Sequence, residues 1–154
     1  MEDIEVRVDD LSSGHVIGLL QEHLDEMRKI TPRGSVHALD RDALNSADLT
    51  FWSAWIDGEI AGCGALREID ATSGEIKSMR TDQKHRNKGV ASRVLAAIES
   101  EARRRGYEVL YLETGAVQGF EAARALYRKY GYVPCAPFAD YKEDLNSMFL
   151  SKEL

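Results

Sequence analysis

The feature that most restricts the fold is a run of three extended segments in the middle of the chain. Residues 49–56 are rich in aromatic side chains and end at Asp57-Gly58, a dipeptide that strongly favours a tight hairpin turn. Residues 60–69 supply the partner strand, and after a turn at residues 71–74 a third strand follows over residues 75–81. The sequence therefore predicts a β-meander at the centre of the fold.

Segments with helical periodicity flank this meander. Apolar side chains recur along one face of residues 88–105, and Gly106 stands where a left-handed C-terminal cap belongs. Two helices are expected before the meander, one from Ser12 or Ser13 to the turn at residues 31–34 and one over residues 35–45. A further helix is expected over residues 120–130, and short strands over residues 4–8, 109–112, 132–135 and 148–154. The order β-α-α-β-β-β-α-β-α-β-β predicts an α/β fold with a mixed, mostly antiparallel central sheet and helices on both faces.

Length and composition limit the classes of function. The 154 residues are expected to form a single domain over residues 1–154, and the net charge of −6 argues against nucleic-acid and anionic-membrane surfaces. No apolar run approaches the roughly 20 residues that span a bilayer. Since no signal peptide is recognised, Cys63 and Cys135 are expected to be packed thiols of a cytoplasmic protein. The four histidines are scattered, and we expect no metal site.

The most informative segment lies just before the long helix. Residues 84–92 read Lys-His-Arg-Asn-Lys-Gly-Val-Ala-Ser, which places several cations at a helix N-terminus. Because the helix dipole already makes this end positive, each fixed cation there is unfavourable by about 0.3–1 kcal/mol unless an anion is bound. Free N–H groups of the first turn can bind phosphate oxygens, and Gly89 and Ala91 leave room for a pyrophosphate. The segment therefore predicts an anion site, with a solvated basic turn as the alternative.

Two short motifs resemble those of a known family. Arg86-x-x-Gly89-x-Ala91 matches the (Q/R)-x-x-G-x-(G/A) signature of the GNAT N-acetyltransferase superfamily, between an extended strand and a long helix. Residues 123–132, Ala-x-x-Leu-Tyr-x-x-x-Gly-Tyr, are similar to the A-x-x-L-Y-x-x-x-G-(F/Y) segment of the same family. The predicted element order is also the GNAT order, so the resemblance covers nearly the whole chain. Residues 74–81 additionally resemble a bacterial subgroup of these acetyltransferases.

The resemblance implies acetyl-CoA as the co-substrate. In the family, the strand before the signature loop pairs with the pantetheine arm, which implies a pantetheine site at Met79, Arg80 and Thr81. The Met79 N–H would then polarise the thioester carbonyl. The signature loop implies a pyrophosphate site made by Arg86, Asn87, Lys88, Gly89, Val90, Ala91 and Ser92.

The resemblance also implies how protons are handled. An alkylammonium with a pKa of about 10 must lose a proton before it attacks, and the departing thiolate gains from a proton donor. Tyr127 matches the family tyrosine proposed as general acid, and Glu75 lies where several members place the base. Glu113 at the end of the neighbouring strand, or a chain of waters, is the alternative base. Strand alternation predicts one shared face for Glu75, Lys77, Met79 and Thr81.

The chain departs from the family pattern at two positions. Phe120 stands seven residues before the tyrosine, where many members have an Asn that contacts pantetheine, so Gln118 is the expected substitute. Asn87 replaces a frequent Gly, and Asn tolerates unusual backbone angles better than most residues.

The implied activity is direct transfer of the acetyl group of acetyl-CoA to an amine of a small molecule or a peptide. In this fold the first two helices shape the acceptor pocket, and the candidates here are Arg33, His37 and Asp40 with Trp52 and Trp55 on the adjacent strand. The alternative function is a non-catalytic coenzyme A-binding sensor or partner module. Family members often dimerise through the C-terminal strands, so a homodimer is one alternative for the oligomeric state.

Overall fold

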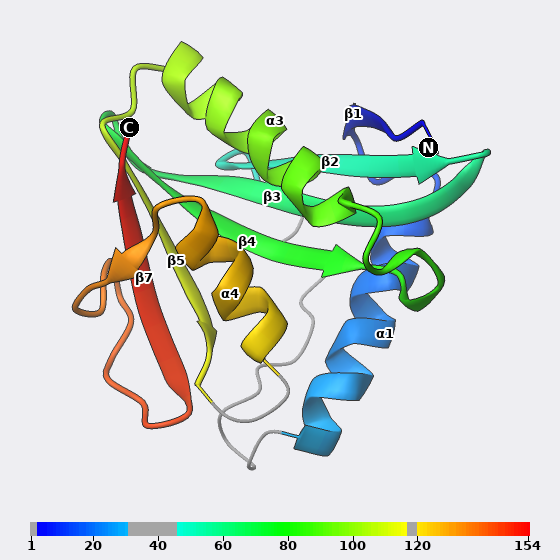
Figure 1. The fold of residues 1–154 in the computed structure, drawn as a ribbon. Coiled ribbons are helices and arrows are strands. Elements are labelled where there is room, and N and C mark those ends of the chain that lie inside the picture. Colours follow the sequence, from blue (N-terminus) through cyan, green and yellow to red (C-terminus); the bar gives the residue numbers. More distant parts are fainter. Residues whose placement is uncertain (1–2, 31–45, 117–119) are drawn as a thin grey trace.

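The structure is a computed structural model that describes residues 3–30, 46–116 and 120–154. Its elements follow the predicted order (Figure 1). They are β1 Glu5–Asp9, α1 His15–Ile30, β2 Leu49–Ile56, β3 Glu59–Asp70, β4 Ser73–Thr81, η1 Gln83–His85, α3 Val90–Arg104, β5 Val109–Gly115, α4 Glu121–Lys129, β6 Val133–Pro134 and β7 Ser147–Glu153. The helix expected over residues 35–45 lies outside the described residues.

The strands form one mixed sheet. Within the described ranges it has seven strands in the order β1-β2-β3-β4-β5-β7-β6, and all neighbours are antiparallel except β4 and β5. The parallel pairing of β4 and β5 runs only from Ser73↔Val109 to Ile76↔Leu112. Beyond Ile76 and Leu112 the two strands continue without pairing to each other, and Figure 1 shows their ends separating. The predicted mixed, mostly antiparallel sheet is confirmed.

Helices cover both faces of this sheet. α3 packs across β2, β3 and β4 on one face, and α1 packs against β3 and β4 on the other (Figure 1). The alternation of β3 shows this directly, because Cys63 packs with α1 whereas the next residue, Gly64, approaches Val94 of α3. α4 lies on the α3 side, where Tyr127 joins the apolar cluster beneath α3. The faces named below are therefore the α1 face and the α3 face.

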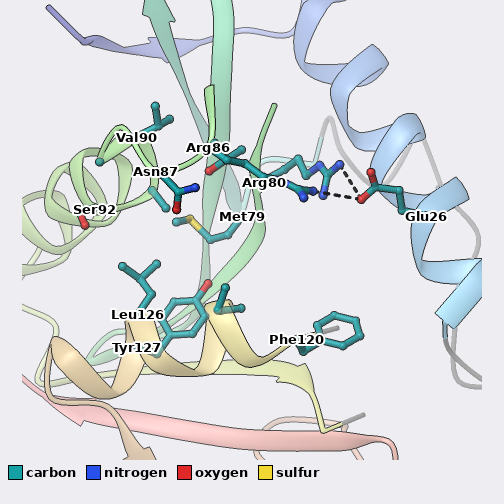
Figure 2. Close-up of a pocket in the computed structure, with 15 residues that line it drawn as sticks. Glu26, Met79, Arg80, Arg86, Asn87, Val90, Ser92, Phe120, Leu126 and Tyr127 are labelled. Carbon is teal, nitrogen blue, oxygen red and sulfur yellow. Dashed lines mark ion pairs between the residues drawn. The ribbon is translucent and has the colours of Figure 1, made fainter. Parts of the chain in front are cut away.

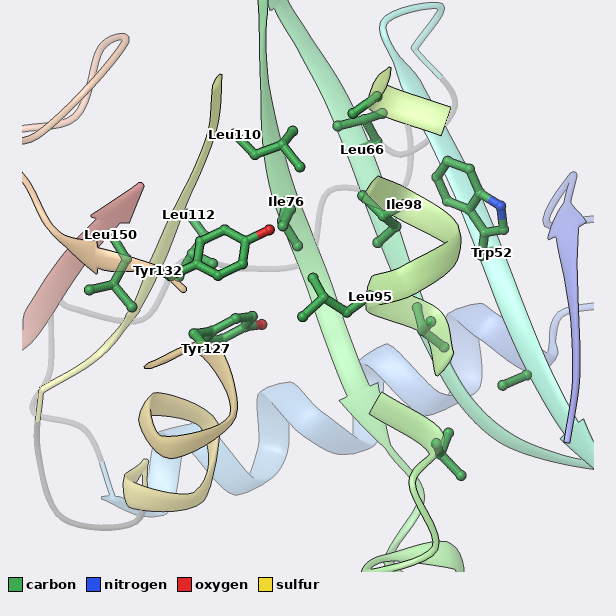
Figure 3. Packing of buried hydrophobic residues seen from close by; sticks show 14 of the residues in the cluster. Trp52, Leu66, Ile76, Leu95, Ile98, Leu110, Leu112, Tyr127, Tyr132 and Leu150 are labelled. Carbon is green, nitrogen blue, oxygen red and sulfur yellow. The ribbon is translucent and has the colours of Figure 1, made fainter. Parts of the chain in front are cut away.

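Two apolar clusters bury the interior. The larger lies on the α3 face, and Figure 3 labels Trp52, Leu66, Ile76, Leu95, Ile98, Leu110, Leu112, Tyr127, Tyr132 and Leu150 within it. The smaller lies on the α1 face and contains Val16, Leu19, Leu20, Phe51, Cys63 and Ala65. The predicted packing role of Cys63 is thus confirmed, since its side chain is fully buried.

The turns adopt the backbone angles that their residues favour. Asp57 and Gly58 both have positive φ, 50° and 79°, as a two-residue hairpin turn that matches the strand twist requires. Gly106 has a φ of 82° and follows the last turn of α3 as a left-handed cap. These two positions explain why the ends of β2 and α3 could be predicted from sequence.

β4 contains an irregularity that the sequence pattern does not reveal. Ala65 pairs with Lys77 and Cys63 pairs with Arg80, so β4 has one more residue than β3 between these pairs. This extra residue makes a β-bulge at Ser78, whose φ is 57°. Lys77 therefore faces α1 with its partner Ala65, whereas Met79 packs against the cluster on the α3 face. The prediction that Glu75, Lys77, Met79 and Thr81 share one face is wrong beyond Lys77.

No helix within the described ranges combines the length and the apolar character that crossing a bilayer requires.

Gly64 gives a direct test of how closely α3 approaches the sheet. A Cβ at this position would lie 2.7 Å from Cγ1 of Val94 and 2.5 Å from the Met79 sulfur. We expect Gly64→Ala to lower the free energy of unfolding by roughly 1–3 kcal/mol, because α3 must shift to relieve this overpacking. The measurement is urea unfolding followed by circular dichroism.

The matched control is Gly18→Ala in α1, where a Cβ would meet nothing within 4 Å. It should raise the free energy of unfolding by about 0.5–1 kcal/mol, since Ala is the better helix former. Equal stability of the two variants would show that α3 is not held at this distance.

Candidate active site

The segment between β4 and α3 holds the predicted anion site. It begins with the short helix η1, which Asp82 caps by accepting a hydrogen bond of 2.9 Å from the Lys84 N–H. Asn87 and Gly89 then both have left-handed backbone angles, with φ of 63° and 85°, before α3 begins at Val90. Asn87 thus adopts the kind of unusual angle that it was expected to tolerate.

The N-terminus of α3 carries no side-chain cap. Its N-cap residue is Gly89, which has no side chain to accept from the first N–H groups of the helix. The donors at this end therefore lack intrahelical partners and combine with the positive end of the helix dipole. A Cβ at Gly89 would meet nothing within 4 Å, so the space beside this backbone is open. This is the arrangement that binds phosphate oxygens in proteins.

A cavity of about 420 Å³ lies beside this helix start (Figure 2). Its wall comes from the end of β4, the loop, the start of α3, one side of α4 and one residue of α1. The lining residues are Glu26, Met79, Arg80, Thr81, Arg86, Asn87, Gly89, Val90, Ala91, Ser92, Phe120, Ala122, Ala123, Leu126 and Tyr127. Of the residues predicted to bind the co-substrate, Lys88 alone is absent from this wall, and its Nζ lies 3.2 Å from Nδ1 of His85.

Glu26 of α1 is a lining residue whose role the sequence did not indicate. Its carboxylate lies 2.7 Å from Nη2 of Arg80 and 3.6 Å from Nη2 of Arg86, as the dashed lines in Figure 2 show. Partial burial acts to raise its pKa, but the hydrogen bond from Gln83 and the charges of Arg80 and Arg86 together hold the pKa below its usual value. Glu26 therefore stays ionised at neutral pH and offsets the positive charge of the anion site.

Tyr127 reaches the cavity from α4. Figure 2 shows its hydroxyl directed toward Met79, on the opposite wall. Its ring packs edge-on against Tyr132, with 5.7 Å between the centroids, and no hydrogen-bond partner for its hydroxyl lies within the described ranges. Burial raises the pKa of Tyr127 above its ordinary value, so the phenol is protonated across the neutral range.

Glu75 lies on the α1 face and does not line this cavity. Its side chain is buried, with Nε of Arg67 donating to Oε1 at 2.9 Å and the Tyr141 hydroxyl donating to Oε2 at 2.6 Å. Lys77 lies 3.7 Å from Oε2, so its charge is part of the same network. Arg67 could have been found from the sequence, because the turn at residues 71–74 sets it opposite Glu75. Tyr141 carries no such signal.

Glu75 nonetheless lies at a special point of the sheet. It pairs with Tyr111 one residue before the last β4–β5 pair, Ile76↔Leu112. The strands separate directly after it, and Met79 lies on β4 three residues beyond Ile76, on the cavity wall. The carboxylate thus lies on the α1 face at the start of this opening, whereas most of the cavity wall comes from the loop, α3 and α4. Glu113, the alternative base, is on β5 one residue past the last pair.

Phe120 stands at the position where the family resemblance implies an Asn. Its ring stands over Gly115 so closely that a Cβ at Gly115 would overlap it. Arg124 completes this contact by donating a 2.7 Å hydrogen bond from Nη1 to the carbonyl oxygen of Gly115. Phe120 thus closes the cavity with an apolar wall, and the expected substitute Gln118 lies outside the described residues.

The predicted acceptor residues are only partly described. Arg33, His37 and Asp40 lie outside the described residues. Trp52 is buried in the large cluster on the α3 face, and Trp55 packs against His15 and the guanidinium of Arg7. Neither tryptophan lines the cavity described above.

Comparisons with known proteins agree with this geometry. The model of the acetyltransferase (GNAT) family matches residues 16–132. The uncharacterized N-acetyltransferase YsnE of Bacillus subtilis (strain 168) is 51% identical over 151 residues, which cover 98% of this chain and 100% of that protein. A protein of Azospirillum brasilense named IAA acetyltransferase is 36% identical and covers 90% of both chains.

Solved structures show the same fold. A Klebsiella pneumoniae protein assigned as an acyl-CoA N-acyltransferase superposes with a TM-score of 0.80 at 29% identity, over 98% of this chain and 97% of that one. A GNAT-family acetyltransferase from Elizabethkingia anophelis with acetyl-CoA bound superposes with a TM-score of 0.71 at 19% identity, over 98% of both chains. The family match and the identity to YsnE show that this chain belongs to the GNAT acetyltransferase family and is an acyltransferase dependent on acetyl-CoA.

Proposed function

We propose that this enzyme transfers the acetyl group directly to the nitrogen of an amine, which belongs to a small molecule or a peptide. The observation that carries the proposal is the continuity of the site. An uncapped helix start, a cavity lined by Tyr127 and the unpaired stretch of β4 adjoin one another. Each of these features serves a different part of an acyl-transfer reaction.

The residues present fit the co-substrate. The open backbone at Gly89 and the N–H groups at the start of α3 would hold the pyrophosphate, with Arg86 at their side. β4 from Lys77 to Thr81 has β3 on one edge and no paired strand on the other within the described ranges. The N–H and C=O groups on that unpaired edge are therefore open to the pantetheine amides. When bound, acetyl-CoA supplies an activated thioester carbonyl.

Two groups facing the cavity would assist at that carbonyl. The Met79 N–H would donate to the carbonyl oxygen, an interaction worth roughly 2.7–4 kcal/mol where negative charge develops. The Tyr127 Oη would act as general acid toward the sulfur. Its pKa is raised by burial, so at neutral pH the proton is present for donation.

Glu75 would receive the proton of the acceptor amine. Oε2 accepts from Tyr141 and keeps a second acceptor position, whereas Oε1 is occupied by the guanidinium of Arg67. Because the side chain is buried, a water would connect Oε2 to the amine. Glu113 remains the alternative base, since it is the more exposed carboxylate at the same opening.

Direct transfer is preferred to an acyl-cysteine route. Neither Cys63 nor Cys135 lines the cavity. Burial raises the pKa of Cys63 to about 12, so its thiol remains protonated and unreactive at neutral pH. The acceptor nitrogen itself is then the nucleophile.

An amine-panel screen tests this function. Purified protein is incubated with acetyl-CoA and each of a set of amino acids, amino-acid amides, polyamines, aryl amines and short peptides, and the released thiol is measured. Acetylated product with any amine supports the proposal. Binding of acetyl-CoA without turnover across the panel would contradict it and favour a coenzyme A sensor.

Two substitutions that shift the charge of the anion site in opposite directions test it. Glu26→Gln removes the carboxylate that neutralises Arg80 and Arg86, and we expect acetyl-CoA to bind about three- to tenfold tighter. Arg86→Glu should weaken binding by about tenfold or more, because it places negative charge beside the phosphates. The dissociation constants are measured by isothermal titration calorimetry at low salt.

The control for these substitutions is Glu22→Gln. Glu22 lies one turn earlier on α1, 3.8 Å from Arg80, and does not line the cavity. It should change affinity less than about twofold. Unchanged affinity in all three variants would remove the phosphate site from this end of α3.

Tyr127→Phe tests the general acid. It should lower kcat by about 10²-fold or more while leaving the affinity for acetyl-CoA within about twofold, because the ring still packs and only the proton donor is lost. Tyr130→Phe, just after α4 and outside the cavity wall, is the matched control. Wild-type turnover in Tyr127→Phe would exclude this tyrosine from the mechanism.

A further inference from the structure

The two strands that separate carry opposite charges directly past their last pair. Ile76 and Leu112 form that pair, Lys77 is the next residue on β4, and Glu113 is the next residue on β5. Lys77 faces α1 together with its partner Ala65. Glu113 lies on the same face, because it follows Tyr111 by two residues on β5 and Tyr111, the pair partner of Glu75, stacks on Phe138 beside Tyr141. A cation and a carboxylate therefore flank the α1-face entrance to the opening.

Lys77 is held in place by a hydrogen bond and, among the described residues, has no carboxylate of its own to neutralise its charge. Its Nζ donates to the Tyr141 hydroxyl at 3.1 Å, while that hydroxyl donates its own hydrogen bond to Oε2 of Glu75 at 2.6 Å. The charge of Glu75 is already matched by Arg67, whose Nε and Nη2 lie 2.9 and 2.8 Å from Oε1. Lys77, Arg67 and Glu75 together therefore carry a net charge of plus one.

The positive groups are also the accessible ones. The Lys77 side chain is 35% exposed and that of Arg67 is 27% exposed, whereas Glu75 beneath them is 2% exposed. Lys77 and Glu113 make no ion pair with each other within the described ranges, so the charge on each side of the entrance can bind another group. The alternative is that Lys77 is an ordinary solvated lysine, but a solvated lysine would not need the hydrogen bond to the half-buried Tyr141.

Aromatic rings fix the position of this tyrosine. Phe138 stacks on Tyr111 with 4.9 Å between centroids and meets Tyr141 edge-on at 5.1 Å. Burial, the hydrogen bond to Glu75 and the charges of Glu75 and Glu113 raise the pKa of Tyr141, so its hydroxyl stays protonated and keeps its donor and acceptor roles. The Lys77 ammonium is consequently held beside a fixed hydroxyl.

We propose that the acceptor is an amine that also carries a carboxylate, as a free amino acid does, and that Lys77 binds this carboxylate with help from Arg67. The carboxylate then lies on the β4 side, and the amine lies toward Glu113 and the water-linked oxygen of Glu75. This inference rests on the proposed acetyl transfer and narrows its acceptor. It favours free amino acids over peptide N-termini, in which the neighbouring carboxyl group is an amide.

The test compares each amino acid with its own carboxamide. Coenzyme A release is measured for alanine, phenylalanine and glutamate and for the corresponding α-amides, with wild type, Lys77→Gln, Lys77→Arg and Lys142→Gln. Lys142 is an exposed lysine on the adjacent loop, so its variant makes the same change of charge away from the entrance. The ratio of kcat/KM between acid and amide cancels any general loss of activity.

We expect wild type to prefer the acids by about tenfold or more, as a charge-assisted contact implies. Lys77→Gln should bring the ratio close to one, Lys77→Arg should retain the preference, and Lys142→Gln should leave it unchanged. Affinity for acetyl-CoA, measured by calorimetry, should be the same in all four proteins.

Three results would overturn the inference, and they are distinguishable. Equal use of acids and amides by wild type would reject a carboxylate-bearing acceptor while acetyl transfer stands. An equal loss for both members of each pair in Lys77→Gln would assign Lys77 to positioning Glu75 and Tyr141 instead. No coenzyme A release with any amine would remove the proposed function itself.

Discussion

The separation of β4 from β5 is the constraint on which the rest of the site depends. A fully paired sheet would satisfy the backbone groups from Lys77 to Thr81 internally and leave nothing for a linear ligand to bind. Because the parallel pairing stops at Ile76 and Leu112, an open edge lies in the middle of the sheet and not at its border. α3 starts beside the cavity that this edge borders, and α4 brings Tyr127 to its wall. The open backbone of β4, the positive end of the α3 dipole and the phenol of Tyr127 thus meet at one cavity, and all three come from this chain.

The positive charges of the anion site need a counterion when no ligand is bound. Arg80 has an 8% exposed side chain and would be costly to bury beside Arg86 without a counterion. Glu26 supplies that counterion from α1, which couples the position of this helix to the anion site. Further along the same face, Arg67 is the counterion of Glu75. Each buried charge therefore has a partner, and a more exposed cation near it, Arg86 or Lys77, can be used for binding.

Most of the architecture could be predicted from sequence because its boundaries are set by local chemistry. Asp57-Gly58 and Gly106 specify their own backbone angles, and apolar spacing distinguishes the strands from α3. The anion site could be predicted for the same reason, since its residues are contiguous. Glu26 could not, because Arg80 lies 54 positions further along the chain, and nothing in either segment marks the other. The shared face of Glu75 and Met79 was predicted wrongly because Ser78 is not a residue type that signals a bulge.

The bulge at Ser78 has a consequence for how the strand divides its tasks. If Ser78 were deleted, Lys77 and Met79 would become neighbours that still alternate, with Lys77 toward α1 and Met79 toward α3, and pairing with β3 would become regular. The inserted residue is therefore dispensable for deciding what each side chain touches. Its contribution is to the path of the main chain, since a bulge increases local twist and bends the strand. Insertion of a single amino acid can in this way change the direction of a strand while its side chains keep their contacts with the core.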